Sequence, residues 1–408
     1  MMAMIWRHRG FAAAGTLALA FALTGCGGDG SATPTNTNTT QTPTPTPPAS
    51  TNAADNAVIQ QFLRLDLNSL ANYAAPALPA YYDSTLDSLD NTPANDPVDD
   101  AIATLGQVLF FDKALSVNNT TSCATCHQQA LGFDDNEQFS TGFSGSAFTA
   151  AHAMRLGNIR YYQPGEMFWD RRAASVEDQA TQPILNPVEM GWQDSGGIPA
   201  LIAKMQGLNY YPVLFRFAYG DEAITEARIE RALAHFERAM ISADSRWDRA
   251  YAQVFNPNAP NRALNAAFPG FTTSEERGKQ LFMTPPNAGG AGCAACHVPP
   301  TFTLAANSRS NGLDAGETTV FKAPSLKSVS RSQFFMHDGR FTSLEQVVSF
   351  YNSGVQDGPA LDNRLRQGNA PQQLNLSAAD QQALVDFLLT LDDATLASDT
   401  RFSDPFIN

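Results

Sequence analysis

Positive charge is scarce in this sequence of 408 residues. It has 26 lysines and arginines against 40 aspartates and glutamates, which gives a formal net charge of −14. A nucleic-acid-binding surface needs clustered cationic side chains to neutralise phosphates, so we expect no nucleic-acid partner. An acidic surface favours either encounter with basic partners or simply solubility.

Long apolar runs are also missing, apart from one at the N-terminus. It follows the basic residues Arg7 and Arg9 and has the length of a signal peptide, too short to span a bilayer as a mature helix. The run ends in an LTGC sequence at Cys26 that resembles a bacterial lipobox. We predict a lipoprotein signal peptide over residues 1–25 and lipidation of Cys26. An ordinary cleaved signal, with Cys26 incidental, is the alternative.

Large apolar side chains are nearly absent from residues 26–56, which are rich in Thr, Pro and Asn. Such a segment cannot bury enough surface to offset its ordering entropy, so we predict a disordered tether. A single lipidated end would tie the following protein body to a membrane, and we expect a periplasmic location. Gly27, rather than aspartate, follows Cys26, which favours the outer membrane under the sorting rule of enteric bacteria.

Cysteine is rare, with five in the chain. The four besides Cys26 form two C-x-x-C-H motifs, CATCH and CAACH. This pattern is typical of c-type haem attachment, in which two thiols add to the haem vinyl groups and the histidine becomes an axial iron ligand. The sequence therefore predicts two covalent c-type haems. The attachment and ligand residues are Cys123, Cys126 and His127 in the first motif and Cys293, Cys296 and His297 in the second.

Other uses of the four cysteines fit the sequence less well. A zinc site would need to combine two pairs that lie far apart in the chain. A thioredoxin-like C-x-x-C is not usually followed by histidine, nor present twice. Disulfides suit an exported protein, but a bridge within C-x-x-C closes too short a loop to stabilise it much.

Runs of alternating strand pattern are not evident, and glycine (28) and proline (25) are frequent. The stretch ITEARIERALAHFERAM places apolar residues on one helical face, and Ser377 and Asp380 resemble a capping box before another apolar stripe. We predict a mainly α, loop-rich fold with few or no strands.

An internal repeat surrounds the two haem motifs. GQVLF precedes the first and GKQLF precedes the second, whereas MFWDRRAASVEDQA and FMHDGRFTSLEQVV follow them. In this alignment Trp169 matches His337. The repeat predicts two related cytochrome c-like haem domains, which we place at residues 57–265 and 266–408.

The two copies differ where an iron ligand matters. An iron held by one histidine is open on its other side unless the protein supplies a sixth ligand. Tyr351 follows His337 at the distance at which Pro183 follows Trp169. Tyr351 is therefore a candidate ligand of the C-terminal haem, whereas proline leaves the N-terminal haem open to a small oxidant. A role for Tyr351 as a core aromatic is the alternative.

Gln179 and Glu189 lie close in sequence to Pro183. A buried carboxyl group can shuttle a proton between the two oxygens of a peroxide, which would be the role of Glu189. The alternatives are a surface carboxylate at Glu189 and a packing role for Trp169. We expect His337 to be structural and His235 to have no special role.

The chain resembles the bacterial di-haem cytochrome c peroxidases and their MauG-like relatives. The resemblance extends over most of the chain beyond the tether and is carried by motifs such as LGQVLFFDKALSVNNTTSCATCHQQALGF, NPVEMG and APSLKSVSRSQFFMHDGRFTSLEQVVSFYNSG. It implies a peroxidatic N-terminal haem on His127 and an electron-transfer C-terminal haem on His297, with Trp169 as the electron relay between them. It also implies that Glu189 is the catalytic acid/base.

The resemblance places Gln179 and Pro183 in the distal pocket of the first haem. MauG-like members carry tyrosine where Tyr351 stands, whereas many of the peroxidases carry methionine. His152 aligns where the family has an asparagine that binds a calcium ion between the haems, so the resemblance leaves calcium open. It leaves a homodimer open as well.

Two enzymatic functions follow from the resemblance. A cytochrome-c-peroxidase-type oxidoreductase would reduce hydrogen peroxide to water with electrons from a small cytochrome c or cupredoxin. A MauG-like enzyme would instead use peroxide to oxidise tyrosine or tryptophan residues of a partner protein. A plain electron-carrying cytochrome is a third function, which an open haem and Glu189 argue against.

Overall fold

The chain is mainly helical, as predicted, in a computed structural model that describes residues 53–407. The α-helices are α1 (Ala53–Ile59), α2 (Asp100–Phe111), α3 (Cys123–Cys126), α4 (Val176–Ala180), α5 (Gln182–Leu185), α6 (Gly197–Gln206), α7 (Tyr210–Tyr219), α8 (Glu226–Arg238), α9 (Arg246–Val254), α10 (Thr273–Met283), α11 (Leu344–Ser349) and α12 (Ala378–Leu389). Two short antiparallel ribbons pair β1 (His297–Val298) with β2 (Thr303–Leu304) and β3 (Arg366–Gln367) with β4 (Ala370–Pro371). Within residues 53–407, no helix combines the length and the apolar character needed to cross a bilayer.

The predicted signal peptide, the lipidated Cys26 and most of the tether lie outside the described residues. Helix α1 begins at Ala53, so the last residues of the 26–56 segment are helical. Both helices expected from the sequence are present. Ser377 caps α12 by accepting a hydrogen bond from the Asp380 amide, which is one half of the predicted capping box.

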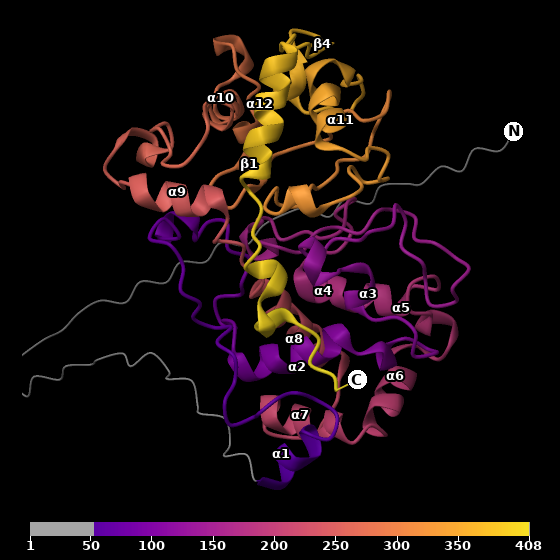
Figure 1. Cartoon of the computed structure of the whole chain (residues 1–408). Coiled ribbons are helices and arrows are strands. Elements are labelled where there is room, and N and C mark those ends of the chain that lie inside the picture. The colour runs from indigo at the N-terminus through magenta and orange to yellow at the C-terminus, as the bar shows by residue number, and fades with distance from the viewer. Residues whose placement is uncertain (1–52, 408) are drawn as a thin grey trace, which may run out of the picture. The chain divides into compact units, whose positions relative to one another are not determined.

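Each haem motif follows a helix that packs against a partner helix through a glycine. Helix α2 packs on α8, and α10 packs on α12 (Figure 1). A Cβ on Gly106 of α2 would lie 2.0 Å from the Ala232 carbonyl oxygen, and one on Gly278 of α10 would lie 1.8 Å from the Ala383 carbonyl oxygen. These distances leave no room for a side chain. The glycine repeated in the sequence therefore allows the same close helix contact in both copies.

The segments that follow the haem motifs also share their local structure. Phe168 and Met336 both have a positive φ, of 66° and 73°. Each is enclosed by an antiparallel bridge, from Met167 to Ala173 in the first copy and from Phe335 to Phe341 in the second. The repeat is thus structural and not only a similarity of letters.

The two copies of the repeat differ in structure after the start of the helix that follows each segment, α4 in the first copy and α11 in the second. Ser175 caps α4 and Ser343 caps α11, each by accepting a hydrogen bond from an amide one turn on. Helix α4 ends at Ala180, and α5 carries Pro183 in its first turn. Helix α11 continues instead into a π-helical turn, Phe350–Gly354, which contains Tyr351. Single π-helical turns are frequent at functional sites.

Two apolar cores underlie the two copies, and each recruits segments from elsewhere in the chain. The first contains residues of α2, α7 and α8 together with Leu396 and Phe402. The yellow C-terminal segment in Figure 1 leaves α12 and ends close to α2 and α8. The second core contains residues of α9, α10 and α12 together with Tyr81. A domain boundary at residue 265 stays a prediction. Helix α9 precedes that residue but contributes to the second core, and the C-terminal segment follows it but contributes to the first core.

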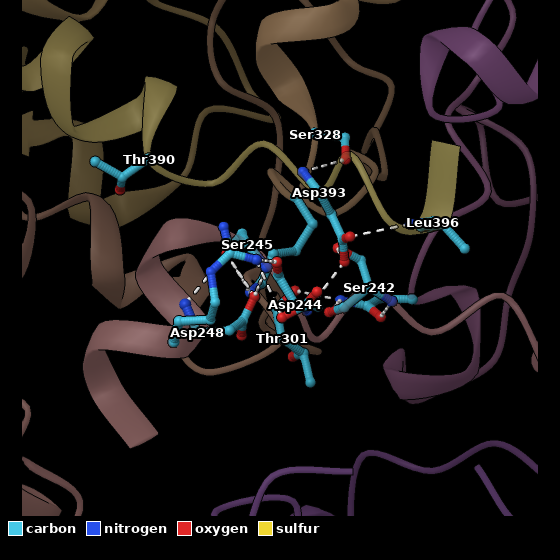
Figure 2. A network of polar contacts seen from close by, with 12 residues as sticks. Ser242, Asp244, Ser245, Asp248, Thr301, Ser328, Thr390, Asp393 and Leu396 are labelled. Carbon is cyan, nitrogen blue, oxygen red and sulfur yellow. Dashed lines mark hydrogen bonds and ion pairs between the residues drawn. The ribbon is translucent and has the colours of Figure 1, made fainter. Parts of the chain in front are cut away.

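A buried polar network joins the connecting segments (Figure 2). One oxygen of Asp393 accepts a hydrogen bond from the Ser242 hydroxyl at 2.8 Å, and the other accepts one from the Leu396 amide at 3.0 Å. Lys327 Nζ lies 2.5 Å from Asp248 Oδ2, and both side chains are fully buried. Breaking such a pair typically costs about 3–5 kcal/mol because one charge is left uncompensated. The network therefore fixes the connector before α9 against the loop that leads to the second repeat segment.

Candidate functional site: two histidine sites joined by a tryptophan

The second C-x-x-C-H motif opens into a cavity of about 670 Å³. Cys293, Cys296 and His297 line it on one side, and Tyr351 also faces it. The cysteines are free thiols. Burial lowers the pKa of His297 to about 4, so its imidazole is neutral, the form that binds a metal. A covalently bound haem fits the size of this cavity, its two thiols and the neutral imidazole of His297.

Tyr351 approaches this cavity from the π-helical turn. Its hydroxyl oxygen accepts a hydrogen bond from Asn311 Nδ2 at 3.4 Å, and burial raises the pKa of Tyr351. The same Asn311 nitrogen lies 3.4 Å from Met336 Sδ. We did not predict Asn311 or Met336 as site residues, because the repeat alignment suggests no role for either as an iron ligand or as a hydrogen-bond donor to one.

The first motif lies on the short helix α3. Reciprocal hydrogen bonds of Ser122 and Thr125 cap its start. His127 Nδ1 lies 3.1 Å from the Phe133 carbonyl oxygen, and this hydrogen bond leaves Nε2 available to bind iron. Burial lowers the pKa of His127, which again favours the neutral imidazole. These residues fit a second covalently bound haem.

Glu189 lies beside the first motif. The pKa of Cys126 is about 12, raised by burial, and the negative charge of Glu189 contributes to the raised pKa of both Cys123 and Cys126. Burial raises the pKa of Glu189 itself, partly opposed by the charge of Arg172. A raised pKa makes it easier for a carboxyl group to hold a proton and then give it up, as a general acid and base must.

A tight turn holds Glu189 in place, and the sequence reasoning missed the residue that builds it. Asn186 donates a hydrogen bond from Nδ2 to Glu189 Oε1 at 2.8 Å, while its own Oδ1 accepts one from the Val188 amide. The Phe143 amide donates to the Val188 and Glu189 carbonyl oxygens, both at 3.1 Å. A short polar residue three positions before the glutamate was the available signal, since asparagine commonly organises such turns.

Gln179 and Pro183 lie on α4 and α5, just before this turn. Both side chains are partly buried. Within the described residues, no hydrogen bond joins Gln179 to Glu189. The structure therefore places them in the neighbourhood of Glu189 without a direct polar link.

Trp169 reaches from the first copy into the cavity of the second. Its indole lines that cavity beside His337, and its Nε1 donates a hydrogen bond to the His152 carbonyl oxygen at 2.8 Å. The imidazole of His337 stacks on Phe321 with 4.1 Å between the ring centroids. His235 is buried in α8 and lies 3.2 Å from Asp96.

His152 belongs to a buried ion-pair cluster. Its Nε2 lies 3.1 Å from Asp134 Oδ1, and an Arg155 nitrogen lies 3.4 Å from the other carboxylate oxygen. Burial favours the neutral imidazole, but the Asp134 carboxylate outweighs it and raises the pKa of His152. Calcium takes six to eight oxygen ligands, and here cationic groups face the one carboxylate. These residues do not fit a calcium ion.

Known proteins share part of this sequence and the fold. Residues 100–254 match a family model described as di-haem cytochrome c peroxidase. The methylamine utilization protein MauG of Methylorubrum extorquens is 31% identical over 315 residues, covering 73% of this chain and 80% of that protein. The chain belongs to the family of di-haem cytochrome c peroxidases and MauG. It is therefore an oxidoreductase of this type, and membership implies two c-type haems.

Both branches of the di-haem family are represented among the similar proteins. The cytochrome c551 peroxidase of Nitrosomonas europaea is 28% identical over 265 residues, covering 60% of this chain and 71% of that protein. A solved structure of a MauG-like protein associated with microbial copper homeostasis aligns with a TM-score of 0.64 and 28% identity, covering 81% of this chain and 99% of that one. The resemblance to the family is confirmed, and the choice between its branches stays open.

Proposed function

We propose that this protein is a periplasmic, lipid-anchored peroxidase that reduces hydrogen peroxide to two waters. The reaction consumes two electrons and two protons, H2O2 + 2e⁻ + 2H⁺ → 2H2O. The electrons come from a small cytochrome c or cupredoxin. Haem iron, when bound, supplies a site for peroxide and a store for electrons. The protein residues attach, ligate and orient it and move the protons.

The observation that carries this proposal is the asymmetry between the two histidine sites. In the C-terminal cavity, both His297 and Tyr351 line the wall, and we assign them as the two iron ligands. In the N-terminal site, the chain offers Pro183 at the matching position and half-buried Glu189, whose charge acts on the thiols. We assign Cys123 and Cys126 to attachment of the N-terminal haem, and Cys293 and Cys296 to attachment of the other.

The proton transfers are assigned to Glu189. Its carboxyl group would accept a proton from one oxygen of peroxide and return it to the other oxygen, which leaves as water. Asn186 holds one carboxylate oxygen, so the other is free to face the substrate. Gln179 and Pro183 shape the open side of the site, and Trp169 carries electrons from the C-terminal site.

A MauG-like function is the second candidate, and Tyr351 favours it. An anionic phenolate stabilises the higher oxidation states of iron better than a thioether does. Stored oxidising equivalents would then withdraw electrons from a tyrosine or tryptophan of a partner protein. Tyrosine ligation is compatible with both functions, so it does not choose between them.

A single rapid-mixing experiment on the holo-protein separates the two candidates. Peroxide is added with and without a reduced small cytochrome c or cupredoxin. The peroxidase predicts rapid oxidation of the donor, with two donor molecules oxidised per peroxide, and a donor-free oxidised state that decays quickly. A donor-free oxidised state that persists for minutes and is discharged by a partner protein would favour the MauG-like function. Failure to consume peroxide under either condition would contradict both.

A further inference from the structure

Lys322 is a buried lysine in apolar surroundings. Its side chain is 4% exposed, and in the described part of the chain its ammonium group has no oxygen acceptor. Nζ lies 3.2 Å from Met167 Sδ and 4.8 Å from the centroid of the Tyr162 ring. Burial lowers the pKa of Lys322 to about 7, and the positive charge of Arg171 contributes to this. A buried lysine of this kind can exchange its proton near neutral pH.

Glu237 is a buried acid in the same neighbourhood. It lies on α8 with 5% of its surface exposed, and its Oε2 has no hydrogen-bond partner in residues 53–407. Burial raises the pKa of Glu237 to about 8, and the charges of Arg238 and Lys322 oppose the rise. Arg238 is itself paired with Glu177, at 2.9 Å. An unpartnered buried carboxylate is costly, so near neutral pH this group also holds or exchanges a proton.

Lys322 contacts the cavity of the second motif, and the charge of Glu237 acts on the first motif. The Lys322 amide donates a hydrogen bond to the Trp169 carbonyl oxygen at 2.7 Å, and the Lys322 side chain lines the same cavity as His297. The charge of Glu237 acts on the pKa of the Cys123 thiol in the first motif. The pair therefore extends from one haem motif to the cavity of the other, beside the tryptophan.

We propose that Lys322 and Glu237 form a buried proton-exchange pair that takes up one proton when an electron enters the C-terminal haem site and releases it when the electron leaves. The proposal rests on the proposed function only in assuming two redox-active haem sites. The electron comes from a small one-electron donor protein and the proton from solvent. The pair gains one proton, either on the Lys322 amine or on the Glu237 carboxylate, and loses it on oxidation.

The physical reason is that these groups are buried away from water. An added negative charge in a region without bulk water interacts strongly with nearby ionisable groups and raises their pKa values. The other charged groups that face the pair are the guanidinium groups of Arg155, Arg171 and Arg238 and the carboxylate of Glu177. Arginine keeps its proton throughout the neutral range, and Glu177 is held ionised by Arg238 although burial opposes this. Lys322 and Glu237 are the members of this group free to change charge.

The test is a spectroscopic redox titration of the C-terminal haem in the holo-protein, repeated from about pH 6 to about pH 9. The wild-type midpoint potential should fall as the pH rises, because reduction is coupled to proton uptake. Lys322→Met and Glu237→Gln should each flatten this dependence. Lys279→Met is the matched control, because Lys279 is also buried but pairs with Glu276 at 2.8 Å and does not line the cavity.

Three outcomes would overturn the proposal: a wild-type potential that is independent of pH, a slope unchanged in Lys322→Met, or a slope lost in only one of the two variants. If Lys322→Met fails to fold, proton uptake by the wild-type protein on stoichiometric reduction, followed with a pH indicator dye, tests the same claim. No uptake near pH 7.5 would contradict it. These measurements need no peroxide, so their failure is distinct from failure of the peroxidase proposal.

Discussion

Trp169 and His337 occupy the same position in the two copies of the repeat, and their rings meet in space. Their centroids are 6.4 Å apart and the ring planes are inclined by 63°. The backbone of His152 joins them, since its carbonyl oxygen accepts from Trp169 and its amide donates to the His337 carbonyl oxygen at 2.9 Å. The repeat thus brings an indole of the first copy to the cavity of the second, where we propose that it relays electrons.

Replacing Trp169 should slow electron transfer more than peroxide binding. Trp169→Phe removes the indole and the hydrogen bond to His152, and we expect oxidation of a reduced donor to slow by about tenfold or more, a barrier increase of at least about 1.4 kcal/mol. Stopped-flow measurement of donor oxidation and of the initial peroxide reaction checks this. The control is Trp192→Phe, because Trp192 is also buried and hydrogen-bonded, to Leu115. Equal slowing in both variants would remove the relay assignment.

Removing the carboxyl group of Glu189 should abolish turnover while leaving the haems in place. Glu189→Gln keeps the shape of the side chain but cannot move a proton, and general acid–base catalysis typically contributes about 10²–10⁴-fold. We expect peroxide turnover to fall by about that factor with both haem spectra unchanged. Glu345→Gln, at an exposed carboxylate on α11, should retain wild-type turnover. Normal turnover in Glu189→Gln would show that another group carries the protons.

Removing the Tyr351 hydroxyl should alter the C-terminal haem alone. Tyr351→Phe deletes the proposed oxygen ligand, so the absorption and magnetic circular dichroism bands of one haem should change while those of the other persist. Asn311 Nδ2 contacts both the Tyr351 hydroxyl and the Met336 sulfur. We therefore expect the Met336 thioether to take the place of the Tyr351 oxygen as ligand in this variant. A Tyr351→Phe/Met336→Leu variant should therefore open the site fully. Spectra unchanged in the single variant would contradict ligation by Tyr351.

The helix contacts at the repeated glycines should tolerate no side chain. Gly106→Ala and Gly278→Ala each force a methyl group against a backbone carbonyl, and overpacking of this kind typically costs about 1–3 kcal/mol. The control is Gly157→Ala, where the added Cβ would meet Leu396 at an ordinary 3.6 Å. Chemical unfolding of the three variants gives the comparison. A stable Gly278→Ala protein would mean that α10 and α12 can separate without penalty.

The features that could be predicted from the sequence are those that occur in both copies of the repeat. A residue kept in both copies indicates a position where the structure requires that residue type. Two C-x-x-C-H motifs, the glycines before them and the serines after them could be matched residue by residue, and the structure shows the glycines and the serines in equivalent surroundings. The mismatch between Pro183 and Tyr351 also has a structural counterpart, in a helix break on one side and a π-helical turn on the other.

Other features depend on contacts between distant segments and had no local signal. Lys322 and Glu237 each look like ordinary surface residues in the sequence, and only folding places them together in an apolar region. The ion pairs of Asp134 with His152 and Arg155 likewise had no signal in the sequence. The C-terminal segment could not be assigned to the first core, because its few apolar residues have no periodic pattern.

Electron paramagnetic resonance of the resting, fully oxidised holo-protein tests the central asymmetry most directly. We predict two distinct ferric signals. One comes from an iron with histidine and tyrosinate as protein ligands, and the other from an iron whose single protein ligand is histidine. Addition of a small anion such as azide or cyanide should then shift only the second signal. Signals typical of two protein ligands on each iron, with neither signal shifted by the anion, would contradict this prediction.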